Sequence, residues 1–360
     1  MNFDFFFQSL EEICGGSFVS PGRPLRVAVI ANPRAGGFSI SSRRKKHLKT
    51  LQEYREKSAA NPKREMYGKN RLFLTDGKGA GKKAALQLIE EAAGNEEPFY
   101  LVITASGDGT CHEVLSAVYG AAPHVRSNMA ALRLPMGTGN DGTCSNNLAG
   151  ALELLMNPVS LFYAPALRLT TAAGGPLSAQ HGGKATFLAF NILSVGADAF
   201  VTHMTNKMKG RLPGDSYKLW VDIAAVFYDI LYKIDYFDLR ALDDQNREVL
   251  SFRERLLLLA MGASGHRTYG AGKRILPDER NVCAVKQTHL FQKLVLKKLL
   301  MQGRLPESPN SINFSARRIE FSTKGPILAQ TDGETVLLQD GDFPASIELT
   351  APVIPLLKML

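Results

Sequence analysis

The fifteen residues YLVITASGDGTCHEV, from Tyr100 to Val114, decide the fold class of this chain. Tyr100–Ala105 is a short, almost continuously apolar run, the glycine-rich turn Ser106–Thr110 follows it, and a helix is expected as far as Tyr119. A strand that is apolar on both faces is typical of a parallel sheet covered by helices on both sides. The stretch therefore predicts one strand–turn–helix unit of an α/β domain.

The same unit recurs three times in the first half of the chain. Its strands are Leu25–Ala31, Arg71–Thr75 and Ala130–Pro135. The helices that follow them are, in the same order, one that starts near Ser41, Lys82–Ala93 and Leu148–Met156. Repeated strand–turn–helix units predict a doubly wound, mostly parallel sheet. We expect this α/β domain to span residues 1–156.

The pattern changes near Asn157. Strand-like runs then dominate, and we expect a β-rich, sandwich-like second domain over residues 157–344. The runs are Ala164–Thr171, Thr186–Val195, Leu256–Met261, Asn281–Gln287, Arg317–Ser322 and Ser346–Thr350. Two helices are expected, at Tyr217–Tyr236 and His289–Met301, and two mobile loops, at Lys57–Asn70 and Thr171–Lys184.

The composition is that of an ordinary globular protein. Of the 360 residues, 45% are hydrophobic and 21% charged, which excludes a disordered tail, a collagen and a coiled coil. The net charge of +9 favours anionic partners such as nucleotide phosphates, an acidic lipid surface or nucleic acid. No recognised nucleic-acid motif appears, so we expect no nucleic-acid partner. No apolar run approaches the ~18 residues of a membrane span, and the four separated cysteines suggest free thiols in a reducing cytosol.

The turn Ser106–Thr110 has the character of a phosphate site. Its glycines let the backbone approach a ligand closely, and the helix start offers N–H groups and a positive dipole end. A carboxylate at Asp108 is unfavourable beside phosphate unless Mg²⁺ or a proton-accepting role offsets the repulsion. The alternative is a tight strand–helix turn closed by a capping box between Thr110 and Glu113.

Two further loops repeat this character, Asn32–Gly37 after the first strand and Pro135–Asp141 after the fourth. All three loops lie at the carboxyl ends of strands. In open α/β sheets that edge is where ligands bind. The three loops together therefore predict one ligand site.

The set of motifs resembles the catalytic domain of the diacylglycerol kinase family, which includes sphingosine and ceramide kinases and bacterial lipid kinases. The motifs are Asn-Pro-x-x-Gly-Gly, Ser-Gly-Asp-Gly-Thr-x-x-Glu-Val and Pro-x-Gly-Thr-Gly-Asn-Asp, in this order. Weaker similarities follow at Phe190–Ala199, at Gly270–Pro277 and at Thr331–Glu334. The resemblance implies a first domain with a fold like that of NAD kinase and phosphofructokinase. It also implies an active site between the two domains and a chain end, residues 345–360, that returns to the first.

The resemblance also implies roles for individual residues. ATP would be held by Asn32, Pro33, Thr75, Ser106, Gly107, Gly109, Thr110, Glu113, Gly137, Thr138, Gly139 and Asn140, with Lys209 and Arg211 near the phosphates. Asp108 would hold Mg²⁺ or activate the lipid hydroxyl. Asp332 and Glu334 would complete the catalytic site, with Glu334 as a second candidate base. The alternative for Asp332–Glu334 is a solvated turn, since Asp-Gly is a common hairpin signal.

Two positions depart from the family pattern. Ala166 stands where many relatives have an aspartate that contacts the lipid head, and Tyr269–Gly272 lacks the usual three glycines. Because the other motifs match the family, we expect an ATP- and Mg²⁺-dependent lipid kinase that phosphorylates a hydroxyl of a diacylglycerol-like or sphingoid lipid. The alternatives are an NAD kinase or phosphofructokinase-type enzyme, which the Asn-Pro and Gly-Thr-Gly-Asn loops argue against, and an inactive lipid- or nucleotide-binding relative.

The expected partners are a lipid substrate and an anionic membrane surface, and the sequence leaves a homodimer open. The stretch His289–Arg304 combines leucines with four basic residues. Such a helix either lies on an anionic membrane or packs against a sheet. We expect a cytoplasmic protein that associates peripherally with the membrane.

Overall fold

The computed structural model describes residues 3–360 except 69, 138–143, 146, 208–222, 224–227, 229–231, 264–267, 270–272, 275 and 277–279. The chain divides into two compact units. The first unit comprises residues 1–164 and 352–360, and the second comprises residues 165–351. Each is described by itself below.

The first unit contains a six-stranded sheet in the order β2-β1-β3-β4-β19-β5. All neighbouring strands run parallel except β5, which is antiparallel to β19. β19, the last strand of the chain, thus lies between β4 and β5. The strands are β1 (Leu25–Ala31), β2 (Arg71–Leu74), β3 (Phe99–Ser106), β4 (Met129–Pro135), β5 (Val159–Ala164) and β19 (Ile354–Met359).

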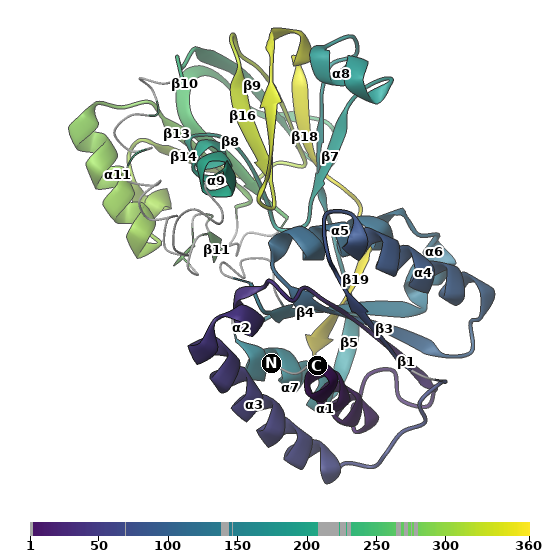
Figure 1. Ribbon diagram of the computed structural model, residues 1–360. Coiled ribbons are helices and arrows are strands. Elements are labelled where there is room, and N and C mark those ends of the chain that lie inside the picture. The colour runs from purple at the N-terminus through teal and green to yellow at the C-terminus, as the bar shows by residue number, and fades with distance from the viewer. Residues whose placement is uncertain are drawn as a thin grey trace. The chain divides into compact units, whose positions relative to one another are not determined.

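Helices cover both faces of this sheet (Figure 1). Side chains alternate along a strand, so Val27 and Val29 of β1 face one core while Ala28 and Ile30 face the other. The first core is closed by α1 (Phe3–Gly15), α3 (Ser41–Ala59) and α7 (Leu148–Met156), and the second by α4 (Ala80–Gly94), α5 (Asp108–Gly120) and α6 (Pro123–Ser127). The short helix α2 (Gly36–Ser39) follows β1. The predicted doubly wound α/β domain is confirmed.

The second unit is built on a curled antiparallel sheet of eleven strands. The long strand β10 (Glu248–Gly262) takes part in both halves of it: residues 248–255 pair with β9, and residues 256–262 pair with β8 and β13. The other strands are β6 (Leu167–Thr170), β7 (Thr186–Ala189), β8 (Ile192–Gly196), β9 (Tyr236–Leu242), β13 (Val282–Lys286), β14 (Ser311–Phe314), β15 (Arg318–Ser322), β16 (Ile327–Thr331), β17 (Glu334–Leu338) and β18 (Ala345–Leu349). The predicted β-rich second domain is confirmed.

Shorter elements complete the second unit. The helices are α8 (Pro176–His181), α9 (Ala197–Lys207) and α11 (Leu290–Gln302), with single turns at Leu305–Glu307 and Asp340–Asp342, and β11 (Thr268–Tyr269) pairs with β12 (Lys273–Arg274). Most of the predicted helix Tyr217–Tyr236 lies outside the described residues.

Several local predictions are wrong. The run Thr186–Val195 forms two strands, β7 and β8, rather than one. The presumed loop Thr171–Lys184 contains α8, because Pro176 is well placed in the first turn of a helix. The sequence patterns did not single out α9 or β9. The strands β16 and β17 were not predicted either, although Asp332-Gly333 between them is a common hairpin signal.

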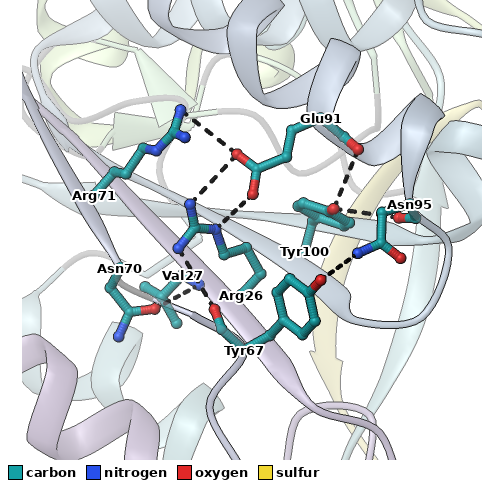
Figure 2. A network of polar contacts seen from close by, with 8 residues as sticks. All are labelled: Arg26, Val27, Tyr67, Asn70, Arg71, Glu91, Asn95 and Tyr100. Carbon is teal, nitrogen blue, oxygen red and sulfur yellow. Dashed lines mark hydrogen bonds and ion pairs between the residues drawn. The ribbon is translucent and has the colours of Figure 1, made fainter.

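A polar network ties α4 to the first unit's sheet (Figure 2). Arg26 of β1 is 5% exposed, and its guanidinium donates to both carboxylate oxygens of Glu91 at 2.8 and 3.4 Å. Arg71 adds an ion pair to Glu91 at 3.5 Å, and the Tyr100 hydroxyl donates to the Glu91 backbone oxygen. A buried charge needs such pairing, because its desolvation is otherwise uncompensated.

We predict that Glu91→Ala lowers the free energy of unfolding by about 2–3 kcal/mol, because it leaves the Arg26 guanidinium buried without its acceptor. Urea unfolding measures this change. The control is Glu90→Ala, which removes an exposed carboxylate from the same helix and should change stability by less than about 0.5 kcal/mol. Equal effects of the two substitutions would contradict the role of the Arg26–Glu91 pair.

Candidate active site

The strand order of the first unit creates a switch point between β1 and β3. The chain passes from β1 to β2 on one side, and from β3 to β4 on the other. The loops that leave β1 and β3 therefore diverge at the carboxyl edge of the sheet. In doubly wound sheets this is the place where ligands bind.

Asn32 joins the two loops at this point. Its backbone N–H donates to Ala105 at 3.0 Å, and its side-chain amide donates to the Thr110 hydroxyl at 3.3 Å. Its side-chain oxygen accepts from the Arg34 backbone N–H at 2.9 Å. Asn32 thus fixes the loop after β1 against the first turn of α5.

The loop after β4 contacts the residues that follow β1. The Gly37 N–H donates to the Met136 backbone oxygen at 2.8 Å, and the Arg43 guanidinium donates to the Gly137 backbone oxygen at 3.1 Å. A methyl group on Gly37 would lie 2.9 Å from Met136, and one on Gly107 would lie 3.7 Å from Gly137. The atoms nearest to such a methyl group at position 37 are the ends of the Met136 and His47 side chains, which would have to shift. The three predicted loops therefore meet at one edge.

Helix α5 starts three residues earlier than the capping-box prediction requires. It begins at Asp108 with Gly107 as its N-cap, and no side chain caps it. The Glu113 carboxylate instead accepts from the backbone N–H groups of Gly79 and Gly81, at 2.6 and 3.0 Å, at the start of α4. The predicted capping box between Thr110 and Glu113 is wrong, because Glu113 points to the neighbouring helix.

The remaining polar groups of this edge are largely buried. The Thr75 hydroxyl donates to Ala31 at 3.4 Å, and the Ser106 hydroxyl donates to Gly107 at 3.1 Å. Asp108 lies half-buried in the first turn of α5. Burial raises the pKa of the Cys111 thiol to about 12, so this thiol stays protonated at neutral pH and is no nucleophile.

The second unit presents the motif Asp332-Gly333-Glu334 on the turn between β16 and β17. Asp332 and Gly333 both have positive φ, 50° and 96°, and Thr331 pairs with Glu334. This is the two-residue hairpin turn that Asp-Gly favours. Glu334 itself is exposed at the first position of β17.

The Asp332 carboxylate binds backbone. It accepts from the N–H groups of Asn191 and Ile192, at 2.9 and 3.0 Å, and from that of Phe190. A carboxylate that accepts several amide hydrogens is strongly held in place. Asp332 therefore fixes the hairpin turn to the segment that enters β8.

A network from α9 holds the other side of this turn. The buried Asp198 accepts from the Ser194 hydroxyl and from the Gln330 amide, the latter at 3.3 Å. The Gln330 side-chain oxygen accepts from the Gly333 N–H at 2.9 Å, and the Asn206 amide donates to the Gly333 oxygen at 2.6 Å. The turn that carries Glu334 is thus positioned from two sides.

Sequence reasoning missed Arg43, Gln330 and Asn206. The side chain of each forms a hydrogen bond with a backbone group of another residue. The partners of Arg43 and Asn206 are more than ninety residues away along the chain. No local motif signals such contacts. The predicted nucleotide residues Thr138, Gly139, Asn140, Lys209 and Arg211 lie outside the described residues. Ala166, which departs from the family pattern, is fully buried.

The described residues contain neither a metal-binding cluster nor a membrane-spanning helix. No cluster of three or more histidine, cysteine, aspartate or glutamate residues there is arranged to hold a metal ion. In the same part of the chain, no helix combines the length and the apolar character that crossing a bilayer requires.

Comparison with known families identifies the class of this protein. Residues 26–160 match the family model described as the diacylglycerol kinase catalytic domain. This segment therefore belongs to the diacylglycerol kinase catalytic-domain family, and the enzyme is a lipid kinase. The resemblance drawn from the sequence motifs is confirmed. A search of curated proteins gave no match.

Solved structures share the fold over almost the whole chain. One is a candidate diacylglycerol kinase from Bacillus anthracis str. Sterne, with a TM-score of 0.59 and 18% identity over 92% of this chain and 94% of that chain. A second structure of that description has a TM-score of 0.56 and 17% identity, and covers 92% and 96% of the two chains. A third, a diacylglycerol kinase of the same organism, has a TM-score of 0.52 and 16% identity with the same coverage.

We predict that Asp332→Ala destabilises the second unit by about 2–3 kcal/mol, because three backbone N–H groups lose their acceptor. Thermal and urea unfolding measure this. Glu334→Gln, two residues away and exposed, should change stability by less than about 0.5 kcal/mol. If Asp332→Ala unfolds like the wild type, Asp332 does not hold the turn.

Proposed function

We propose that this lipid kinase transfers the γ-phosphoryl group of ATP, with Mg²⁺, to a hydroxyl of a diacylglycerol-like or sphingoid lipid. The observation that supports the proposal most directly is the meeting of three glycine-bearing loops at the switch point between β1 and β3. The family match covers the segment that carries all three loops.

The loops offer what a nucleotide phosphate requires. The first turn of α5 supplies backbone N–H groups and the positive end of the helix dipole, and no side chain occupies its cap. Gly107, Gly109 and Gly137 would let the phosphates approach the backbone. Asn32 and Thr110, which are hydrogen-bonded to each other, would orient the nucleotide beside them.

The residues at this edge fit Mg²⁺ bound mainly through the nucleotide. Mg²⁺ in kinases is usually held by one or two carboxylates together with substrate phosphates, so a separate cluster of acidic ligands is not required. Asp108, in the first turn of α5, is the carboxylate that would hold it. When bound, the ion neutralises charge that develops on the transferred phosphoryl group.

The acceptor side of the reaction needs a base for the lipid hydroxyl. We assign that role to Glu334, because it is exposed and its turn is fixed by Asp332 and by Gln330. Asp332 would then act as a positioning residue rather than a catalytic one. A positioned carboxylate that accepts the proton contributes ~10²–10⁴-fold to such reactions.

The proposed acceptor resides in a membrane, so the enzyme has to work at a lipid surface. The net charge of +9 favours an anionic surface. We propose that the protein acts in the cytoplasm as a peripheral membrane protein.

We predict that the purified protein transfers label from [γ-³²P]ATP to a diacylglycerol or a sphingoid base in mixed micelles, and not to NAD. Asp108→Asn should reduce this transfer at least 100-fold, because the neutral amide binds Mg²⁺ more weakly than a carboxylate and cannot accept a proton. Circular dichroism serves as the control for folding. Labelling of NAD alone, or Asp108→Asn activity within a few-fold of the wild type, would overturn the proposal.

We further predict that Glu334→Gln lowers kcat about 100-fold or more and leaves the KM for ATP within twofold, because Glu334 would act on the acceptor and not on the nucleotide. Steady-state kinetics with varied ATP measure both constants. An increase of the ATP KM with normal kcat would assign Glu334 to nucleotide binding instead.

A further inference from the structure

Helix α11 has apolar side chains on two faces. Leu296 is buried in the core of the second unit with Cys283 and Val285 of β13, and Leu300 packs against the same core. The other face carries Leu290, Phe291, Leu294 and Val295, all of them exposed. A surface helix of a globular protein typically has one apolar stripe, directed at the core. The second apolar face of α11 is therefore not explained by the packing of the described residues.

The exposure of this face is high. Phe291 is 82% exposed and Val295 57%, while Leu290 and Leu294 are each 45% exposed. Their spacing of one and four residues places them together on one side of the helix. Contiguous exposed apolar patches mark surfaces that interact with a protein or a membrane. We call these four residues the outer face of α11.

Charge distinguishes the two kinds of partner. No aspartate or glutamate occurs between Lys286 and Pro306, whereas the helix carries three lysines. Lys293 is buried and Lys297 half-buried, so Lys298 is the exposed lysine of α11. Lys298 is exposed, follows Leu294 by four residues, and makes no ion pair within the described part of the chain. An apolar face with an exposed lysine and no carboxylates complements an anionic lipid surface.

We propose that the outer face of α11 inserts into the interface of an anionic bilayer and docks the second unit there, with Lys298 at the lipid phosphates. The helix would lie in the plane of the membrane, with Phe291 as the deepest side chain. The inference rests on the proposed function in one respect, because a lipid acceptor gives the enzyme a reason to reside at that surface. It identifies the element that makes the contact (α11, Figure 1).

Sedimentation of the full-length protein with vesicles tests this without nucleotide and without turnover. The vesicles contain phosphatidylcholine with 30% phosphatidylglycerol, or phosphatidylcholine alone. Phe291→Gln/Val295→Gln removes two exposed apolar side chains and keeps good helix formers in their place. The matched control is Leu74→Gln/Val249→Gln, since Leu74 and Val249 are 51% and 49% exposed on other elements.

We expect Phe291→Gln/Val295→Gln to weaken binding to the anionic vesicles at least tenfold, because two large apolar side chains no longer enter the interface. The control should bind within twofold of the wild type. Lys298→Gln should weaken binding to anionic vesicles about fivefold and leave binding to neutral ones unchanged. Equal thermal unfolding of all variants confirms that α11 still packs.

Vesicle binding by Phe291→Gln/Val295→Gln equal to that of the wild type would overturn the proposal. A second overturning result is a dimer of the wild type that these substitutions convert to a monomer, since the outer face would then cover a second copy. If Phe291→Gln/Val295→Gln binds vesicles tenfold more weakly but the wild type phosphorylates no lipid, the docking is supported and the proposed function is rejected. The two proposals can thus fail separately.

Discussion

The structure of the first unit depends on one topological constraint: β1 and β3 are parallel neighbours whose chains leave in opposite directions. Both strands are completely buried, so their polar backbone ends emerge only at the edge of the sheet. The helices that follow, α3 and α5, pack on opposite faces of the sheet. Asn32 and Thr110 of the two loops are hydrogen-bonded to each other, and the loop after β4 contacts the first loop through Gly37. A phosphate-sized ligand is the partner that such an edge suits.

The acidic residues of the two motif regions divide into different tasks. Glu113 and Asp332 accept hydrogen bonds from backbone N–H groups and hold, respectively, the start of α4 and the turn after β16. Asp108 and Glu334 stand in those same motifs at the two positions that we propose for chemistry. Carboxylates that bind backbone fix geometry, and a fixed geometry is what a positioned base or metal ligand requires. A motif in a sequence does not distinguish these two tasks.

The second unit contains features that the family match does not describe, since that match ends at residue 160. Its sheet curls because β10 pairs with β9 along one half and with β8 and β13 along the other. Helix α11 covers the β13 side with one apolar face and leaves the other exposed. The sequence alone left two readings of this helix open, a membrane contact and packing on a sheet. The structure shows that Leu296 packs in the core, whereas Leu290, Phe291 and Leu294 are exposed.

The sequence by itself determined the four parallel strands of the first unit's predicted repeats and the helices that follow them, but not α1, α2, α6 or β5. The strand Leu25–Ala31 and the helix Leu148–Met156 have the predicted bounds, because buried parallel strands and amphipathic helices leave a local pattern of apolar residues. The glycine-bearing loops and the family could also be predicted from the sequence, because each motif consists of residues close together along the chain. Only the tertiary structure decided the strand order, the partner of Glu113 and the role of Asp332. Those depend on contacts between residues that are distant along the chain, such as Asp332 and Asn191, and no local pattern records such contacts.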